Sequence, residues 1–191
     1  LHAVSLYLPS PYDVENVAFD LDNDEAPVTL ESDASKDFVG YIFKLEDGAY
    51  GQLSYMRIYQ GKIAKGDTMI NMTNGKKHTV GRLMRVHSAD TEDISVAEAG
   101  DIVAVFGIDC ATGTTFTNGD LNYNMTSMFV PAPVIDMKLI LNDRKNSANL
   151  SKALNRFGKE DPTFRVRVDE ESGDTIISGM GELHLEIYVE R

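Results

Sequence analysis

Apolar and polar residues alternate along much of the chain's first two thirds, at the spacing typical of β-strands. Short alternating runs separated by turn residues recur between residues 38 and 117: "FVGYIFKL", "LSYMRIYQ", "DTMINMT", "KKHTVGRLMRVH" and "DIVAVFG". Asn74 and Gly75 lie between two of these runs and predict a hairpin, because both residues tolerate positive φ. Short strands at this spacing predict a β-barrel over residues 38–120 rather than a βαβ sheet.

The pattern changes after residue 133. "VIDMKLIL" predicts a strand, and the stretch "NSANLSKALNRFG" has an apolar helical face. That face consists of Leu150, Ala153, Leu154 and Phe157. Gly158 is expected to end the helix, and "FRVRVD" and "DTIIS" then predict a hairpin around "ESG". This order predicts an α+β domain over residues 134–191 of the ferredoxin-like βαββαβ type, here as βαββα, with the last strand expected beyond the chain.

The stretch "SGMGELHLEI", residues 178–187, is compatible with two structures. From Leu183 onward apolar and polar residues alternate, which favours a strand. Three glutamates also recur at every fourth position, which favours a helix. The position of the stretch in the βαββαβ order decides for a helix that begins after the turn Gly179–Gly181 and is cut at Arg191. Both ends of the chain are expected to be cuts in a longer protein.

Three segments show neither the strand spacing nor the helix spacing of apolar residues. Residues 1–16 contain two prolines and form a junction. Residues 17–37 are acidic and predict a linker or long loop. Residues 121–133 are polar, contain Pro131 and Pro133, and predict a linker between the two domains.

The acidic segment resembles a calcium-binding loop in its spacing. Acidic residues occupy the first, third, fifth and twelfth positions of an EF-hand loop: Asp20, Asp22, Asp24 and Glu31. The sixth position needs glycine for its sharp turn and holds Glu25. No flanking helices are predicted, so we do not expect a metal site.

Composition narrows the function classes. The net charge is −12, yet residues 51–87 carry seven basic residues and one acidic residue. Such a local excess suits a phosphate backbone, although a solvated sheet face would look the same. No apolar run approaches the roughly 20 residues of a membrane helix, and no membrane contact is expected. The single Cys110 is expected to be a small buried apolar residue.

The motifs of the common enzyme classes do not occur. The chain contains no phosphate-loop motif, no His-Glu-x-x-His and no Gly-x-Ser-x-Gly. Its four histidines are far apart in the sequence, and one cysteine cannot form a zinc site. From the residues alone, no catalytic site is expected in this chain.

Several stretches together resemble elongation factor G, the translocation GTPase of bacterial-type ribosomes. In the last third they are "KALNRFGKEDPTFRV" and "SGMGELHLEIYVER", similar to that family's third domain. In the barrel they are "FVGYIFKLEDGAYGQLSYMRIYQGKIAKGDTMIN" and "AGDIVAVFGIDCATGTTFT", similar to its second domain, and "YLPSPYDV" resembles the exit of its GTPase domain. The resemblance covers most of the chain apart from the acidic segment and the linker.

The resemblance implies a set of partners and roles. The GTPase domain that binds GTP and Mg²⁺ would precede Leu1, with residues 1–16 as its tail, and domains IV and V would follow Arg191. The barrel would be domain II and would contact small-subunit ribosomal RNA. The α+β domain would be domain III, truncated in its second helix, between the GTPase domain and domain V and in contact with a small-subunit protein. Residues 118–133 are the candidate hinge.

Two sets of site residues follow from the resemblance and the charge pattern. The expected ribosomal RNA contacts are Lys76, Lys77, Arg82 and Arg85. The expected interdomain contacts are Gly179, Met180, Gly181, Glu182 and His184. His184 could equally be a packed core histidine, and the four cations could be a solvated outer face of the barrel.

The stretch "FGIDCATG" resembles the mitochondrial branch of the family, which implies the mitochondrial matrix. Two alternatives remain open at this point. One is the paralogous mitochondrial factor that recycles ribosomes. The other is a stand-alone, non-enzymatic RNA- or protein-binding module.

Overall fold

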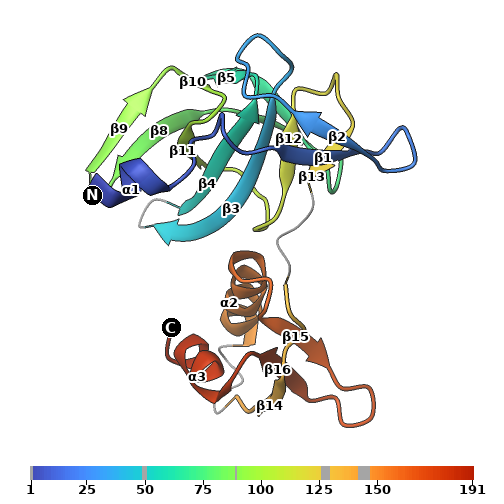
Figure 1. The fold of residues 1–191 in the computed structure, drawn as a ribbon. Coiled ribbons are helices and arrows are strands. Elements are labelled where there is room, and N and C mark those ends of the chain that lie inside the picture. Colours follow the sequence, from blue (N-terminus) through green and yellow to red (C-terminus); the bar gives the residue numbers. More distant parts are fainter. Residues whose placement is uncertain (1, 49–50, 89, 126–129, 142–146) are drawn as a thin grey trace. The chain divides into compact units, whose positions relative to one another are not determined.

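The computed structural model describes residues 2–48, 51–88, 90–125, 130–141 and 147–191. The chain divides into two compact units, Leu1–Ser127 and Met128–Arg191. The first is built of strands and the second of two helices and a small sheet (Figure 1). Each unit has its own apolar core, so each is described by itself.

A short helix, α1 (His2–Tyr7), precedes the strands of the first unit. The strands are β1 (Asn16–Asp20), β2 (Ala26–Leu30), β3 (Val39–Gly48), β4 (Gly51–Gln60), β5 (Lys62–Ala64), β6 (Thr68–Asn71), β7 (Lys77–Thr79), β8 (Arg82–His87), β9 (Asp90–Ile94), β10 (Val96–Glu98), β11 (Ile102–Phe106), β12 (Thr115–Thr117) and β13 (Tyr123–Met125). They form an eight-stranded sheet in the order β7-β6-β12-β3-β4-β11-β8-β9 and two smaller sheets, β10-β5 and β13-β1-β2.

The eight-stranded sheet curls around an apolar core (Figure 1). Strand β4 shows how the sequence period builds it: Met56 and Ile58 are fully buried, and their neighbours Tyr55, Arg57 and Tyr59 are only half-buried. Strands β7 and β8 lie far apart in the strand order although only Val80 and Gly81 separate them in the chain. Curvature that brings distant strands together is what the barrel prediction requires.

The predicted hairpin at Asn74 and Gly75 is confirmed, since β6 and β7 pair around it. Gly75 has a φ of 69°, the left-handed conformation that such turns need. The stretch "KKHTVGRLMRVH", expected as one strand, is instead divided into β7 and β8. Val80 bonds to both Gly66 and Asp67 outside the ladder, and this contact interrupts the strand.

Residues 17–37, expected as a linker or loop, contain the hairpin β1–β2. Strand β1 also pairs with β13, with Ala18 opposite Met125, so part of the expected linker at 121–133 belongs to a sheet. The acidic turn of the hairpin holds Asp24 and Glu25 at positive φ. The sequence period missed this sheet because its strands are short and one partner lies about a hundred residues further along the chain. The middle of the expected hinge, residues 126–129, lies outside the described residues.

The second unit follows the predicted βαββα order. Its elements are β14 (Ile135–Leu139), α2 (Ser147–Glu160), β15 (Arg165–Val168), β16 (Thr175–Gly179) and α3 (Glu182–Glu190). The sheet order is β14-β16-β15, which is that of the first three strands in a split βαβ unit. Phe157, Phe164, Ile177 and Leu185 form its buried core.

Two helix predictions have different outcomes. The stretch from Glu182 is a helix, as its place in the element order predicted, and Leu185 is its buried residue. Helix α2, however, continues through Gly158 to Glu160. Gly158 is therefore not the helix end. The turn comes at Asp161, where the Phe164 N–H donates to the Asp161 carbonyl.

Candidate functional site

The turn between β16 and α3 is packed tightly against the helix that follows it. A Cβ atom on Gly179 would lie 2.6 Å from Leu185 Cδ2 and 2.8 Å from His184 Nδ1. Gly179 is buried and Leu185 is fully buried, so only a residue without a side chain fits. Gly181 caps α3 in an extended conformation with φ 172°, and a Cβ there would meet no atom within 4 Å.

His184 holds this turn to the end of α2. Its Nδ1 accepts a hydrogen bond of 3.1 Å from the Met180 N–H, so the ring hydrogen must be on Nε2. Nε2 lies 2.8 Å from Asp161 Oδ2 and donates to it. His184 was expected to be either a packed histidine or an interdomain contact. The structure shows it in contact with residues of its own unit. The predicted contact with a GTPase domain stays a prediction.

Asp161 is the centre of this network, which the sequence did not reveal. Its Oδ2 also accepts the Tyr188 hydroxyl at 3.0 Å, and its Oδ1 accepts the Thr163 N–H and hydroxyl. Burial alone would raise the pKa of Asp161, but the hydrogen bonds from Thr163, His184 and Tyr188 outweigh burial and lower it. Burial, followed by the Asp161 charge, raises the pKa of Tyr188. One ionised carboxylate thus joins α2 to α3.

The predicted interdomain residues lie in this turn or at the start of α3. Gly179 and His184 are held by close packing and hydrogen bonds, whereas Gly181 has open space around it and the Met180 and Glu182 side chains are exposed. The exposed pair is free to contact a neighbour. We find no bond-making chemistry in this arrangement, because its polar atoms are occupied with one another.

The four predicted RNA-contact cations differ in their surroundings. Arg82 Nε lies 2.7 Å from Asp93, and Arg85 lies 3.9 Å from Asp101. The hydrogen bond that Arg82 donates to Asp93 raises the pKa of Arg82. Both arginines therefore neutralise acids of their own chain. Exposed pairs of this kind contribute only about 0–1 kcal/mol and can be exchanged for phosphate.

Lys76 and Lys77 differ from the arginines. They lie at and just after the β6–β7 turn, and both are exposed. Within the described residues no ion pair involves either lysine. Of the four predicted contacts, these two have positive charges that are directly available to a phosphate.

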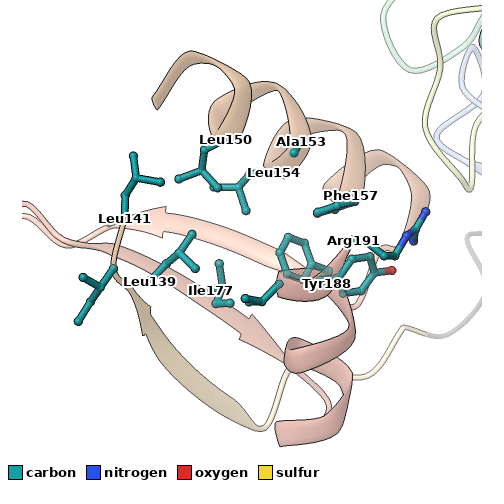
Figure 2. Close-up of a pocket in the computed structure, with 12 residues that line it drawn as sticks. Leu139, Leu141, Leu150, Ala153, Leu154, Phe157, Ile177, Tyr188 and Arg191 are labelled. Atoms are coloured by element: carbon teal, nitrogen blue, oxygen red, sulfur yellow. The ribbon is translucent and has the colours of Figure 1, made fainter. Parts of the chain in front are cut away.

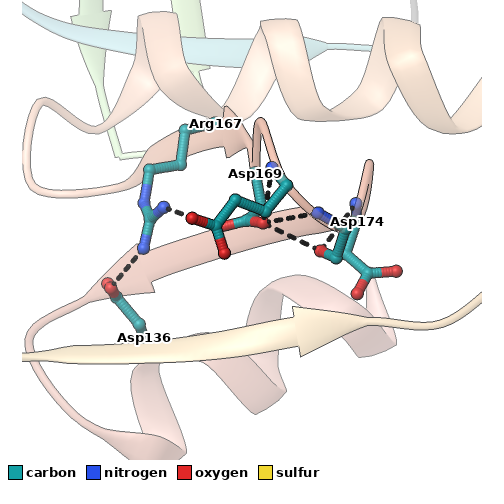
Figure 3. Close-up of polar contacts among 6 residues, drawn as sticks. Asp136, Arg167, Asp169 and Asp174 are labelled. Atoms are coloured by element: carbon teal, nitrogen blue, oxygen red, sulfur yellow. Dashed lines mark hydrogen bonds and ion pairs between the residues drawn. The ribbon is translucent and has the colours of Figure 1, made fainter.

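A charged network covers the outer face of the second sheet (Figure 3). Arg167 bonds to Asp136 at 2.9 Å across the sheet and lies 3.8 Å from Asp169. Lys138 pairs with Asp174 at 2.7 Å. The Ser172 backbone and hydroxyl lower the pKa of Asp169 by donating to it. Two cations thus pair with three carboxylates, which leaves this network with one excess negative charge.

A pocket of about 410 Å³ opens between α2, the end of β14 and the end of α3 (Figure 2). Leu139, Leu150 and Leu154 point into it, and only Tyr188 and Arg191 bring polar atoms to its wall. Such a lining suits apolar packing and carries no reactive group.

The remaining residues that could carry chemistry have structural roles. Cys110 is buried, as predicted, and Gln52 donates to its carbonyl oxygen. Across the described ranges no group of three or more His, Cys, Asp or Glu side chains could hold a metal ion. Of the helices that the structure describes, none is long and apolar enough to cross a membrane.

Comparison with known families matches both units in chain order. Residues 51–117 match the family model described as "Elongation factor Tu domain 2", and residues 130–191 match "Elongation Factor G, domain III". The first unit therefore resembles domain 2 of elongation factor Tu and the second resembles domain III of elongation factor G, and we call them domain II and domain III. The acidic hairpin precedes the matched part of domain II, and the His184–Asp161 network lies within domain III.

Proteins named "Elongation factor G 1" align with all 191 residues. The identity is 58% for the one from Treponema pallidum, 56% for Desulfotalea psychrophila and 55% for Borreliella burgdorferi. The chain spans 28% of the length of each. A solved structure from Thermus thermophilus covers 81% of the chain with a TM-score of 0.70 at 24% identity, and the chain covers 24% of it. That likeness supports the fold alone.

Proposed function

We propose that this chain forms the scaffold domains of a ribosomal translocation factor, which uses GTP hydrolysis to drive tRNA and mRNA movement. The observation that supports the proposal is the continuous alignment of the whole chain, at 55–58% identity, with elongation factor G proteins of much greater length. GTP and Mg²⁺ would bind to the GTPase domain of the larger protein, which makes that protein a GTP hydrolase. Domains II and III would perform no bond chemistry themselves.

The two domains have different roles in this proposal. Domain II would contact small-subunit ribosomal RNA through Lys76 and Lys77. Domain III would contact a small-subunit protein and lie between the GTPase domain and domain V. The turn Gly179–Gly181 would transmit nucleotide-dependent movement, because the close packing of Gly179 against Leu185 and His184 couples the turn to α3.

The test is functional and uses the full-length protein. Translocation of a peptidyl-tRNA from the A to the P site is measured in one assay, and splitting of post-termination ribosomes in another. The proposal expects GTP-dependent translocation. Splitting without translocation would support the recycling paralogue instead, and activity in neither assay would contradict both.

Charge reversal at Lys76 and Lys77 tests the RNA contact. We expect the double variant Lys76→Glu, Lys77→Glu to bind ribosomes about tenfold more weakly at low salt, with a salt slope reduced by about 2. The matched control reverses Lys62 and Lys65, two exposed lysines on and just after β5. Affinity is measured by sedimentation with ribosomes across a salt series. Equal losses in the two double variants would indicate a general charge effect and contradict a specific contact.

Localisation to the mitochondrial matrix stays a prediction, and it rests on the stretch "FGIDCATG" alone. The relatives named above are bacterial and do not support it. Fractionation of cells that express the tagged full-length protein tests it. Recovery with the mitochondrial matrix is the expected result. Recovery in any other fraction would contradict the prediction.

A further inference from the structure

The chain contains the tripeptide Thr-Asn-Gly twice, at residues 73–75 and 117–119. An asparagine that precedes glycine is open to a reaction with its own backbone, because glycine has no Cβ to shield its nitrogen from the asparagine side chain. Both glycines have positive φ, 69° at Gly75 and 99° at Gly119. The two sites are therefore alike in local sequence and backbone, and their surroundings decide which of them reacts.

The Asn74 site lies on an open turn. Asn74 is exposed, and a Cβ atom on Gly75 would meet no atom within 4 Å. Asn74 Oδ1 accepts the Lys76 N–H at 3.0 Å. Across the residues that the structure describes, the Asn74 amide nitrogen donates no hydrogen bond. The carbonyl group of this side chain is thus polarised, whereas its NH₂ group is not held.

The Gly75 nitrogen can be released without unfolding the barrel. Its N–H donates to the Asn71 carbonyl at 2.8 Å, and this bond must open before the nitrogen reacts. Strand β7, which follows the turn, has three residues and comes at one end of the strand order, next to β6. Short edge elements open locally at a free energy well below that of global unfolding.

The Asn118 site is held on both sides. Asn118 Nδ2 donates to Asp37 Oδ1 and to Asp120 Oδ2, each at 3.0 Å. These carboxylates fix the side-chain amide and disfavour further negative charge on it. A Cβ atom on Gly119 would lie 2.7 Å from Ile70 Cδ1, so close packing holds the backbone as well. The fold thus protects one of the two sites.

We propose that Asn74 is a site of spontaneous deamidation, which converts it to aspartate or isoaspartate in the folded chain while Asn118 persists. The Gly75 nitrogen attacks Asn74 Cγ, and an N–Cγ bond forms as the Cγ–Nδ2 bond breaks. The proton of the Gly75 N–H passes through water to the departing nitrogen, which leaves as ammonia. Water then opens the cyclic imide at either carbonyl. No group is oxidised or reduced, and water is the only co-reactant.

The surroundings of Asn74 favour the charge that develops in this reaction. The attack places negative charge on Oδ1, to which the Lys76 N–H already donates. The side chains of Lys76 and Lys77 are exposed on the same turn. Positive charge near a developing anion lowers its energy. The Asn118 carboxylates have the opposite effect.

Deamidation would change the charge of the turn that carries Lys76 and Lys77. The new carboxylate is ionised at neutral pH, so the two lysines and one carboxylate reduce the net charge of residues 74–77 from +2 to +1. The consequence for binding rests on the proposed contact of these lysines with ribosomal RNA. Aged protein would bind ribosomes more weakly than new protein, with a salt slope reduced by about 1.

The test compares the two sites within one sample. The whole chain is incubated at neutral pH, and peptide mapping by mass spectrometry follows the conversion of each asparagine over time. We expect Asn74 to react at least about tenfold faster than Asn118, a difference of about 1.4 kcal/mol in activation free energy. Equal rates, or no conversion of Asn74, would overturn the proposal.

The denatured chain is the matched control, because the same tripeptide forms both sites. In urea we expect the two rates to become similar. A ratio that persists unchanged in urea would show that the residues after the glycines decide, and would overturn the proposal. In the folded chain, the double variant Asp37→Ala, Asp120→Ala is expected to speed conversion of Asn118 alone. An unchanged Asn118 rate would overturn the proposed cause of its protection.

A second measurement separates the effect on binding from the proposed function. In the full-length protein, Asn74→Asp is compared with Asn74→Ser, which leaves the turn without a carboxylate. We expect the salt slope of ribosome binding to fall by about 1 in Asn74→Asp only. If the slopes are equal while Lys76→Glu, Lys77→Glu still reduces the slope, the charge effect of deamidation is wrong and the RNA contact stands. If the lysine variant also leaves the slope unchanged, the RNA contact itself is contradicted, whereas the mass-spectrometric result for Asn74 is unaffected.

Discussion

Replacing Gly179 by alanine is expected to destabilise domain III by about 2–3 kcal/mol, the upper part of the range for overpacking a core. The added methyl group would lie 2.6 Å from Leu185 Cδ2 and 2.8 Å from His184 Nδ1. Leu185 is fully buried, so its side chain can move only by repacking the core around it, and His184 is held by Asp161 and Met180. The φ of Gly179 lies outside the range of +20° to +160° that residues with a side chain rarely adopt, so the cost is steric rather than conformational.

Hydrogen exchange of the α3 amides measures this effect, because the two units need not unfold together. Gly181→Ala is the matched control, two residues away. Its Cβ would meet no atom within 4 Å, and its extended backbone suits any residue. We expect the control to change stability by less than about 1 kcal/mol, the scale of helix-cap effects. Similar losses in both variants would mean that glycine is needed for flexibility and would contradict the packing explanation.

Replacing Asp161 by asparagine is expected to destabilise domain III by about 2 kcal/mol at pH 7. The asparagine NH₂ group would face the donors of His184 and Tyr188, leaving partly buried hydrogen-bonding groups unsatisfied. The hydroxyl and N–H of Thr163 would keep an acceptor in the remaining amide oxygen. The loss of stability should therefore arise mainly at the contact between α2 and α3.

The effect of Asp161→Asn should depend on pH in a defined direction. The pKa of Asp161 is lower in the folded chain than its ordinary value. The Asp161 carboxylate thus makes its full contribution to the free energy of unfolding above the ordinary carboxyl pKa of about 4. This stabilisation is lost as the pH falls through the lower pKa of the folded state. The difference in α3 exchange protection between the parent and Asp161→Asn should shrink over that acidic range.

Glu186→Gln provides the control for that pH series, since Glu186 is an exposed carboxylate on the same helix. It is expected to alter protection by less than about 0.5 kcal/mol at every pH. A difference between the parent and Asp161→Asn that stays constant as pH falls would show that the Asp161 charge does not stabilise the network.

Local patterns predicted the elements whose partners are near in the sequence. The β6–β7 hairpin follows from Asn74 and Gly75, whose conformational tolerance is a property of the residues themselves. The α3 helix needed more than its local pattern, because alternation from Leu183 favours a strand. The position of this stretch in the βαββα order correctly predicted a helix. Three strands and one helix come before it, and a second helix is needed to cover the sheet.

The errors arose where distant residues determine the structure. Strands β1 and β2 are short and joined by an acidic turn. Strand β1 is completed by β13, which no local window contains. Gly158 was expected to end α2, but its backbone stays helical as far as Glu160. The site was only partly predictable for the same reason. His184 was singled out by its motif, whereas Asp161 and Tyr188 are identified only by the contact between α2 and α3.

The pairing of β1 with β13 has a consequence for synthesis of this domain. Asp22 also accepts a hydrogen bond from Asn122, so the first strand of this unit depends on β13, its last described strand. During translation, β3 and β4 can form their hairpin early, while β1 and β2 stay without a completed sheet until residue 125 has left the exit tunnel. The acidic turn residues of that hairpin would keep the waiting segment soluble and discourage wrong strand pairing in the nascent chain.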